Sequence, residues 1–215
     1  MSTTTTSAMA SLVGSLADNK AALGRRYAEW AVSAPTLESA VAAAAMAQDE
    51  MGHARSTYPV LKALGVEAGD EGLEGRGNRL AILDGELPDW TAFVAACVDS
   101  SVVQMAQRAR KILQEEGSHR VHAEAWARRL SRAGDAQRAA LVARLLETWE
   151  HAGRWTGPDD DQAYAAALEA GEVSQTPAQQ RELMRDWLTA LLEGEGVSIS
   201  LPDPDFTGWD PERRR

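Results

Sequence analysis

The segments Glu50-Met51-Gly52-His53 and Glu116-Gly117-Ser118-His119 repeat one short pattern, a glutamate followed three residues later by a histidine. Residues three apart on an α-helix share a face, so each pair can present a carboxylate oxygen and an imidazole nitrogen to one cation. Apolar or small residues continue both faces at helical spacing, with Met46 before the first pair and Ala123 after the second. Because buried carboxylates need a partner, the two pairs predict a shared metal site.

The rest of the chain favours helices. Ala, Leu, Glu and Arg dominate, and β-branched runs with period-two alternation are nearly absent, so we expect an all-α fold. Caps, prolines and periodicity predict helices over 19–33, 36–64, 135–155, 161–169 and 176–193, with a short helix near 79–83. A helical pattern also covers 90–133. It must contain a turn, for which Asp99-Ser100-Ser101 is the best candidate, although this segment is equally compatible with a helix.

This order of elements favours one architecture. Four-helix carboxylate proteins combine two Glu-x-x-His motifs with one carboxylate from each of the other two helices. The Gly-, Asp- and Glu-rich segment 67–88 suits the long crossover between helix pairs in such bundles. We therefore predict a ferritin-like four-helix bundle over residues 11–195, with additional C-terminal helices, a disordered tail over 1–10 and an extended tail over 196–215.

Composition narrows the class of protein. With 215 residues the chain fits one domain, and its net charge of −10 disfavours nucleic acid as a partner. No segment approaches the roughly 20 apolar residues of a membrane span. The lone Cys97 excludes an internal disulfide framework, so we expect a cytoplasmic protein.

The remaining ligands are less clearly marked. Glu29 follows the apolar side of the first predicted helix, so it either bridges the metals or lies at the rim of the bundle. Asp99 is the acidic candidate after Trp90, and it is either a ligand or a turn residue. Hard oxygen ligands combined with imidazole suit iron or manganese better than structural zinc.

Several segments resemble the phenylacetyl-CoA epoxidase family, and most of all its catalytic A subunit. They are Glu29-Trp30 with Ala34-Pro35-Thr36-Leu37, Ala47-Gln48-Asp49-Glu50-Met51-Gly52-His53-Ala54, Lys111-Ile112-Leu113-Gln114-Glu115-Glu116 with His119, and Leu201-Pro202-Asp203-Pro204-Asp205. The resemblance implies two irons, with Glu29, Glu50, His53, Glu116 and His119 as ligands. The family also includes a structural subunit in which the Glu and His of the second helix are replaced, whereas Glu50 and His53 are present here.

One region departs from the family pattern. Between Trp90 and Glu116 the chain is about a dozen residues short, which corresponds to roughly three helical turns. If Asp99 matches the family's aspartate ligand, the helix hairpin after it is truncated. If Asp99 matches the following turn, the ligand-bearing part of the helix is missing.

Two functions follow as hypotheses. The first is a di-iron oxygenase component that epoxidises the ring of an aromatic acyl-CoA such as phenylacetyl-CoA. The sequence contains no flavin, nicotinamide or iron–sulfur motif, so a separate reductase would supply electrons, and we expect a homodimer or a hetero-oligomer with a structural subunit. The alternative is a non-catalytic structural subunit or a diverged paralogue of such a complex. Iron storage uses similar ligands but needs a cage.

Overall fold

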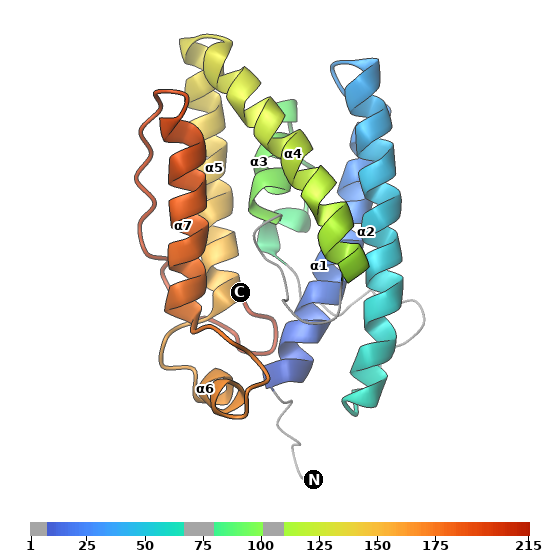
Figure 1. The fold of residues 1–215 in the computed structure, drawn as a ribbon, viewed down its shortest axis with the longest axis vertical. Helices are drawn as coiled ribbons and strands as arrows, with labels where there is room; N and C mark the ends of the chain where they lie inside the picture. Colours follow the sequence, from blue (N-terminus) through green and yellow to red (C-terminus); the bar gives the residue numbers. More distant parts are fainter. Residues whose placement is uncertain (1–7, 67–79, 101–109) are drawn as a thin grey trace.

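The computed structural model describes residues 8–66, 80–100 and 110–215. For residues 99, 100 and 110–115 it describes the backbone only. The described residues form helices and no strands, in a ferritin-like bundle (Figure 1). The α-helices are α1 Ala8–Trp30, α2 Leu37–Ala63, α3 Trp90–Ser100, α4 Arg110–Arg132, α5 Asp135–Thr156, α6 Gln162–Glu169 and α7 Pro177–Glu193, and a 3-10 helix, η1, spans Ala81–Leu83. The predicted fold class is confirmed, including the additional C-terminal helices.

Helices α1 and α2 form a long hairpin on one side of the bundle (Figure 1). Their close approach depends on Gly24, because a Cβ there would lie 2.8 Å from Met51 Cγ and 3.2 Å from the Ala47 carbonyl oxygen. Thr36 caps α2 by accepting a hydrogen bond from the Ser39 amide, and α2 continues through Pro59 to Ala63. The hairpin therefore sets Glu50 and His53 of α2 directly against α1.

The second half of the bundle contains α3, α5 and α7, and α4 crosses diagonally between the two halves (Figure 1). A cluster of aromatic side chains packs α1, α3 and α4 against one another. Tyr27 of α1 packs edge-on against Phe93 of α3 at 5.3 Å between ring centroids, Phe93 stacks on Trp90 at 4.4 Å, and Trp90 meets Trp126 of α4 at 5.1 Å. Such pairs add stability beyond the area they bury, and here they fix α4 relative to α1.

The start of α1 differs from the prediction. Asp18, the residue before the predicted start and thus its expected N-cap, lies inside the helix instead, is 1% exposed and accepts a hydrogen bond from the Tyr58 hydroxyl at 3.0 Å. The helix begins eleven residues before the predicted Asn19, at Ala8, so residues 8–10 of the predicted tail are helical. Residues 1–7 lie outside the described part of the chain.

Most of the other predicted boundaries agree with the structure. The Thr176–Gln179 capping box begins α7, with both reciprocal hydrogen bonds formed. Helix α3 extends to Ser100, so Asp99 is helical in its backbone, whereas residues 101–109 lie outside the description. No helix in the described ranges has an apolar stretch long enough to cross a membrane.

Residues 197–215 follow α7 without regular secondary structure and lie against α5 and α7 (Figure 1). Trp149 of α5 donates to the Pro202 carbonyl at 2.7 Å, and Trp209 donates to the Arg154 carbonyl at 2.9 Å. Pro204 packs so tightly on α5 that a Cβ on Gly153 would lie 2.3 Å from its Cγ. The C-terminal segment is thus extended and packed on the bundle.

Candidate metal centre

A buried lysine lies between two buried glutamates at the junction of α1, α2 and α4. Lys20 Nζ is 3.2 Å from Oε1 and 3.0 Å from Oε2 of Glu50, and it also forms a hydrogen-bonded ion pair with Glu116 Oε1. The exposed fractions of Lys20, Glu50 and Glu116 are 5%, 0% and 1%. These ion pairs are therefore shielded from solvent, unlike surface pairs.

Both predicted histidines face the same two carboxylates. His53 Nδ1 lies 3.6 Å from Glu50 Oε2 and 3.6 Å from Glu116 Oε1. His119 Nδ1 lies 3.4 Å from Glu50 Oε1 and 3.5 Å from Glu116 Oε2. The structure therefore brings the two Glu-x-x-His pairs together, with 6.4 Å between the imidazole centroids. Their role as ligands stays a prediction.

The outer nitrogen of one histidine has its own carboxylate. His119 Nε2 lies 3.1 Å from Asp49 Oδ2, across from α4 to α2. A carboxylate in this position fixes the orientation of the imidazole and makes its inner nitrogen a better ligand or acceptor. Sequence reasoning missed Asp49 because it faces α4 only after the two helices are placed.

Burial and charge act in opposite directions on these groups. Burial favours the neutral form of Glu50, but the Lys20 ammonium and the close approach of the His119 and His53 imidazoles outweigh it and hold the pKa of Glu50 well below its usual range. Burial also disfavours the charged form of Lys20, yet the carboxylates of Glu50 and Glu116 raise its pKa. Against the same desolvation, the adjacent carboxylates of Glu116 and Glu50 raise the pKa of His119 to about 10. Two cations thus offset two carboxylates.

The donor set suits one cation better than two. Ligand atoms of Glu50, Glu116 and His119 all lie within 4.8 Å of one another. Glu116 Oε2 and His119 Nδ1 are buried with no hydrogen-bond partner among the described residues. A pair of irons in this architecture draws further carboxylates from the other two helices. Helix α1 contributes Lys20 instead, and the side chain of Asp99 lies outside the description, so the described residues do not fit a di-iron centre.

Glu29, predicted as a ligand, does not reach the cluster. Its side chain is 47% exposed and pairs with Arg26, with Nη1 2.7 Å from Oε1. Glu29 lies nine residues after Lys20, and at about 100° per residue it points to the opposite side of α1. The buried face contains Lys20 and Tyr27, and Lys20 is the sole basic residue between positions 8 and 24, which is the signal that sequence reasoning overlooked.

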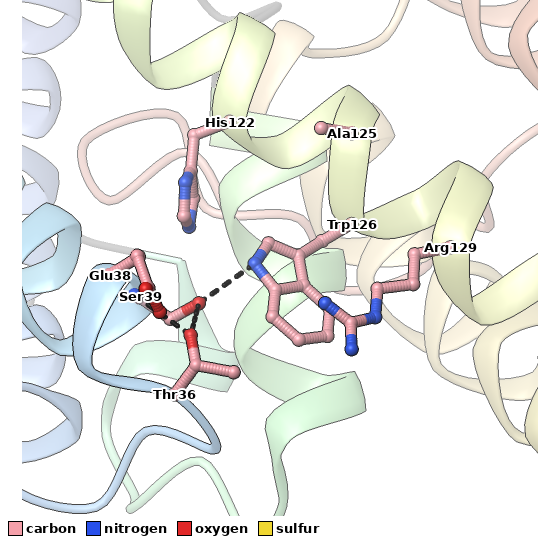
Figure 2. A pocket seen from close by; sticks show the side chains of 7 residues that line it. All are labelled: Thr36, Glu38, Ser39, His122, Ala125, Trp126 and Arg129. Atoms are coloured by element: carbon pink, nitrogen blue, oxygen red, sulfur yellow. Dashed lines mark hydrogen bonds between the residues drawn. The ribbon is translucent and has the colours of Figure 1, made fainter.

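A separate pocket of about 320 Å³ lies further along α4, where this helix meets the start of α2 (Figure 2). Trp126 donates to Ser39 Oγ at 3.0 Å, and the Arg129 guanidinium lies 4.7 Å from the Trp126 ring centroid. The pocket is lined by Thr36, Glu38, Ser39, His122, Ala125, Trp126 and Arg129. Because none of these residues belongs to the Lys20 cluster, the pocket is not an opening of that cluster.

The family model of the phenylacetic acid catabolic protein matches this chain twice, over residues 1–94 and 90–215. The chain belongs to the phenylacetic acid catabolic protein family. Membership links it to phenylacetate catabolism, and members of the family are part of a multi-subunit phenylacetyl-CoA oxygenase complex. The family model does not distinguish the catalytic from the structural subunit. A comparison with curated proteins gives no match.

Proposed function

We propose that the chain is a subunit of a multicomponent oxygenase that acts on an aromatic acyl-CoA such as phenylacetyl-CoA, and that its role there is structural. Family membership supports the reaction class. The observation that carries the structural role is the pairing of Lys20 with both Glu50 and Glu116. A monovalent cation fixed to the chain thus occupies the carboxylate cluster.

The charges of the cluster support this assignment. A di-iron centre brings at least four positive charges, whereas the described cluster offers two carboxylates and places a lysine between them. Adding both irons would leave an excess of positive charge in a buried site, where uncompensated charge is costly. The two Glu-x-x-His pairs then stabilise the junction of α1, α2 and α4.

The second candidate is the catalytic di-iron component. One observation favours it, since Glu50, Glu116 and His119 retain ligand atoms within 4.8 Å of one another. If iron were bound, these residues and His53 would hold it, and the metal would supply the activation of dioxygen. Asp49 would orient His119 in that case, and electrons would come from a reductase.

Iron analysis separates the two candidates. The full chain is produced in iron-replete medium, purified without chelators, and analysed by elemental mass spectrometry together with its circular dichroism. The structural role predicts only trace iron in a folded, helical protein. A content of about two irons per chain, the stoichiometry of carboxylate-bridged centres, would overturn the structural role and establish the second candidate.

An assembly assay tests the proposed complex. The chain is mixed with a catalytic subunit of a phenylacetyl-CoA oxygenase, and the mixture is followed by size-exclusion chromatography with light scattering. We expect a stable hetero-oligomer whose oxygenase activity, with a reductase present, is unchanged by Glu116→Gln in this chain. An activity that is lost with Glu116→Gln while the complex stays intact would contradict the structural role.

A further inference from the structure

We propose that the Lys20 ammonium stands in for a metal ion, and that its removal opens a site for one divalent cation held by Glu50, Glu116 and His119. This inference rests on the proposed function, because both depend on the ion pairs of Lys20. It goes further in that it concerns which metal the cluster binds when Lys20 is absent. It names the residue that separates a metal-free subunit from a metal-binding one.

The position of the ammonium is the first argument. Lys20 Nζ bonds to both carboxylates that a metal would bridge, one from each Glu-x-x-His pair. A cation placed there by covalent attachment neutralises the carboxylates at all times and needs no metal supply. Since the side chain is buried, the ammonium cannot be exchanged for a hydrated ion without a large rearrangement of Lys20.

The unused donor atoms are the second argument. Glu116 Oε2 and His119 Nδ1 have no hydrogen-bond partner among the described residues, although their residues are only 1% and 3% exposed. Buried polar atoms are rarely left unpaired. These atoms lie 3.5 Å apart beside the carboxylates that bind Lys20, and His119 Nδ1 becomes a ligand atom once it gives up its proton to solvent.

Distances and charge together limit the site to one ion. Two oxygens bound to the same divalent metal at about 2.1 Å lie at most about 4.2 Å apart. His119 Nδ1 lies 3.4 Å from Glu50 Oε1 and 3.5 Å from Glu116 Oε2, both inside this limit, and all three ligand atoms lie within 4.8 Å of one another. Once the lysine is gone and the metal has displaced the His119 proton, one divalent ion balances the charge of the two carboxylates, and His53 Nδ1, 3.6 Å from each carboxylate, provides a fourth donor.

The test is Co²⁺ titration of the purified full chain, followed by visible absorption, with stoichiometry from elemental analysis. Lys20→Gln removes the charge while keeping a polar side chain, and Lys62→Gln removes an exposed lysine of α2 as the matched control. We expect Lys20→Gln to bind one Co²⁺ per chain, about 100-fold more tightly than either the native chain or Lys62→Gln, a gain comparable to the effects of outer residues on metal sites.

Second substitutions in the Lys20→Gln chain identify the ligands. Adding Glu116→Gln should abolish binding, and adding Asp49→Asn should weaken it by about 10-fold because His119 loses its orienting partner. A folded Lys20→Gln chain that binds no more Co²⁺ than Lys62→Gln would overturn the inference, as would binding that survives Glu116→Gln. Either result leaves the structural role standing, whereas iron in the native chain would remove that role first.

Lys20→Glu tests the site even where the metal-free variant folds poorly. Lys20→Glu adds a carboxylate to the cluster, so it should fold poorly with chelator present and regain helical structure when refolded with Mn²⁺. Metal-dependent folding is the behaviour of a site that forms only in the folded state. If neither substitution at Lys20 gives a folded, metal-loaded protein under any of these conditions, the inference is wrong.

Discussion

Lys20 and Arg214 are both buried cations, yet they meet different partners. Lys20 pairs with the carboxylates of Glu50 and Glu116, which carry net charge. Arg214, 1% exposed, donates through Nε to the Trp155 carbonyl at 2.8 Å and through Nη2 to the Thr156 carbonyl. Main-chain carbonyls at a helix end need a donor, whereas carboxylates accept any cation. Removing Lys20 therefore leaves groups that another cation can neutralise, whereas removing Arg214 leaves carbonyls that need a hydrogen-bond donor.

Arg214 also has a carboxylate nearby, with Nη1 3.8 Å from Asp161 Oδ2, but aromatic rings surround its guanidinium, and among the described residues Lys20 has no such ring contact. The guanidinium carbon lies 5.7 Å from the Trp155 ring centroid, 5.6 Å from Tyr164 and 5.5 Å from Trp209. These rings come from α5, α6 and the C-terminal segment, so one cation joins three parts of the chain. Cation–π contacts strengthen as the cation is desolvated, which suits a site that holds the C-terminal segment in place.

The largest effect is expected for Lys20→Met in the absence of metal. Two buried carboxylates lose their cation, and breaking a buried pair in this way costs about 3–5 kcal/mol of unfolding free energy at pH 7. The pKa of Glu50 is depressed in the folded chain, so the stability it contributes is present above its ordinary value of 4.5 and is lost as the pH falls. The difference between native and variant should therefore shrink toward pH 4.

Urea unfolding with EDTA present, at a series of pH values, measures this difference. Lys62→Met is the control, and as an exposed substitution it should change stability by less than about 0.5 kcal/mol. A Lys20→Met chain as stable as the control at pH 7 would show that the carboxylates do not depend on Lys20.

A smaller effect is expected for Arg214→Met. Two buried carbonyls lose their donor, and Asp161, with Oδ2 3.8 Å from Nη1, loses a longer ion pair than those of Lys20, so the cost is about 2–3 kcal/mol. Burial lowers the pKa of Arg214 to about 10, and this value is too high for the group to titrate between pH 5 and 8. The loss should therefore stay constant over that range, in contrast to Lys20→Met. Arg213→Met, on the exposed neighbour, is the control, and a pH-dependent loss for Arg214→Met would erase the distinction between the two sites.

The sequence predicted the orientation of α2 and α4 better than that of α1. The seams around Glu50 and Glu116 predicted that the pairs face each other because both helices have one buried face. Helix α1 has no such pattern, since residues 10–15 and 17–24 are all buried. With apolar and polar residues buried alike, periodicity indicated neither the start of the helix at Ala8 nor the direction of Lys20.

Other features depend on tertiary contacts that local patterns do not contain. The apolar side of the first predicted helix left two alternatives for Glu29, a bridging ligand or a position at the rim, and only the packed bundle shows that its side chain is 47% exposed. Arg214 reads as one of three consecutive arginines, a pattern that normally indicates solvent exposure. By contrast, the Thr176 capping box was predictable because all of its hydrogen bonds are local.

Alanine substitutions at Gly153 and Gly52 compare backbone packing at the C-terminal segment with that of α2. Gly153→Ala places a Cβ 2.3 Å from Pro204 Cγ, so the C-terminal segment must shift and stability should fall by about 1.5 kcal/mol. Gly52→Ala, between Glu50 and His53, meets nothing within 4 Å and should stabilise α2 by about 0.5–1 kcal/mol. Thermal unfolding of both variants measures the effects. A loss of stability in Gly52→Ala would mean that the exposed face of α2 is packed more tightly than its geometry indicates.

The last prediction involves no change in stability. It concerns the reactivity of the Cys97 thiol, which lies near the Lys20 cluster. Burial, opposed by a hydrogen bond with Tyr27 and supported by the nearby carboxylates of Glu50 and Glu116, raises the pKa of this thiol to about 12. At pH 8 its thiolate fraction is therefore about 10³-fold below that of an unfolded cysteine, and iodoacetamide should label the native chain correspondingly slowly. Mass spectrometry of timed samples measures the rate, and the chain in urea supplies the unfolded reference.

Labelling of Cys97 in Lys20→Met and Arg214→Met tests whether the Lys20 cluster and the C-terminal segment open independently. Lys20→Met weakens the junction beside α3 and should accelerate labelling, whereas Arg214→Met weakens the attachment of the C-terminal segment and should leave the rate near that of the native chain. Equal acceleration in both variants at matched stability would mean that the bundle opens as one cooperative unit. The two buried cations would then differ in their partners but not in the part of the fold they stabilise.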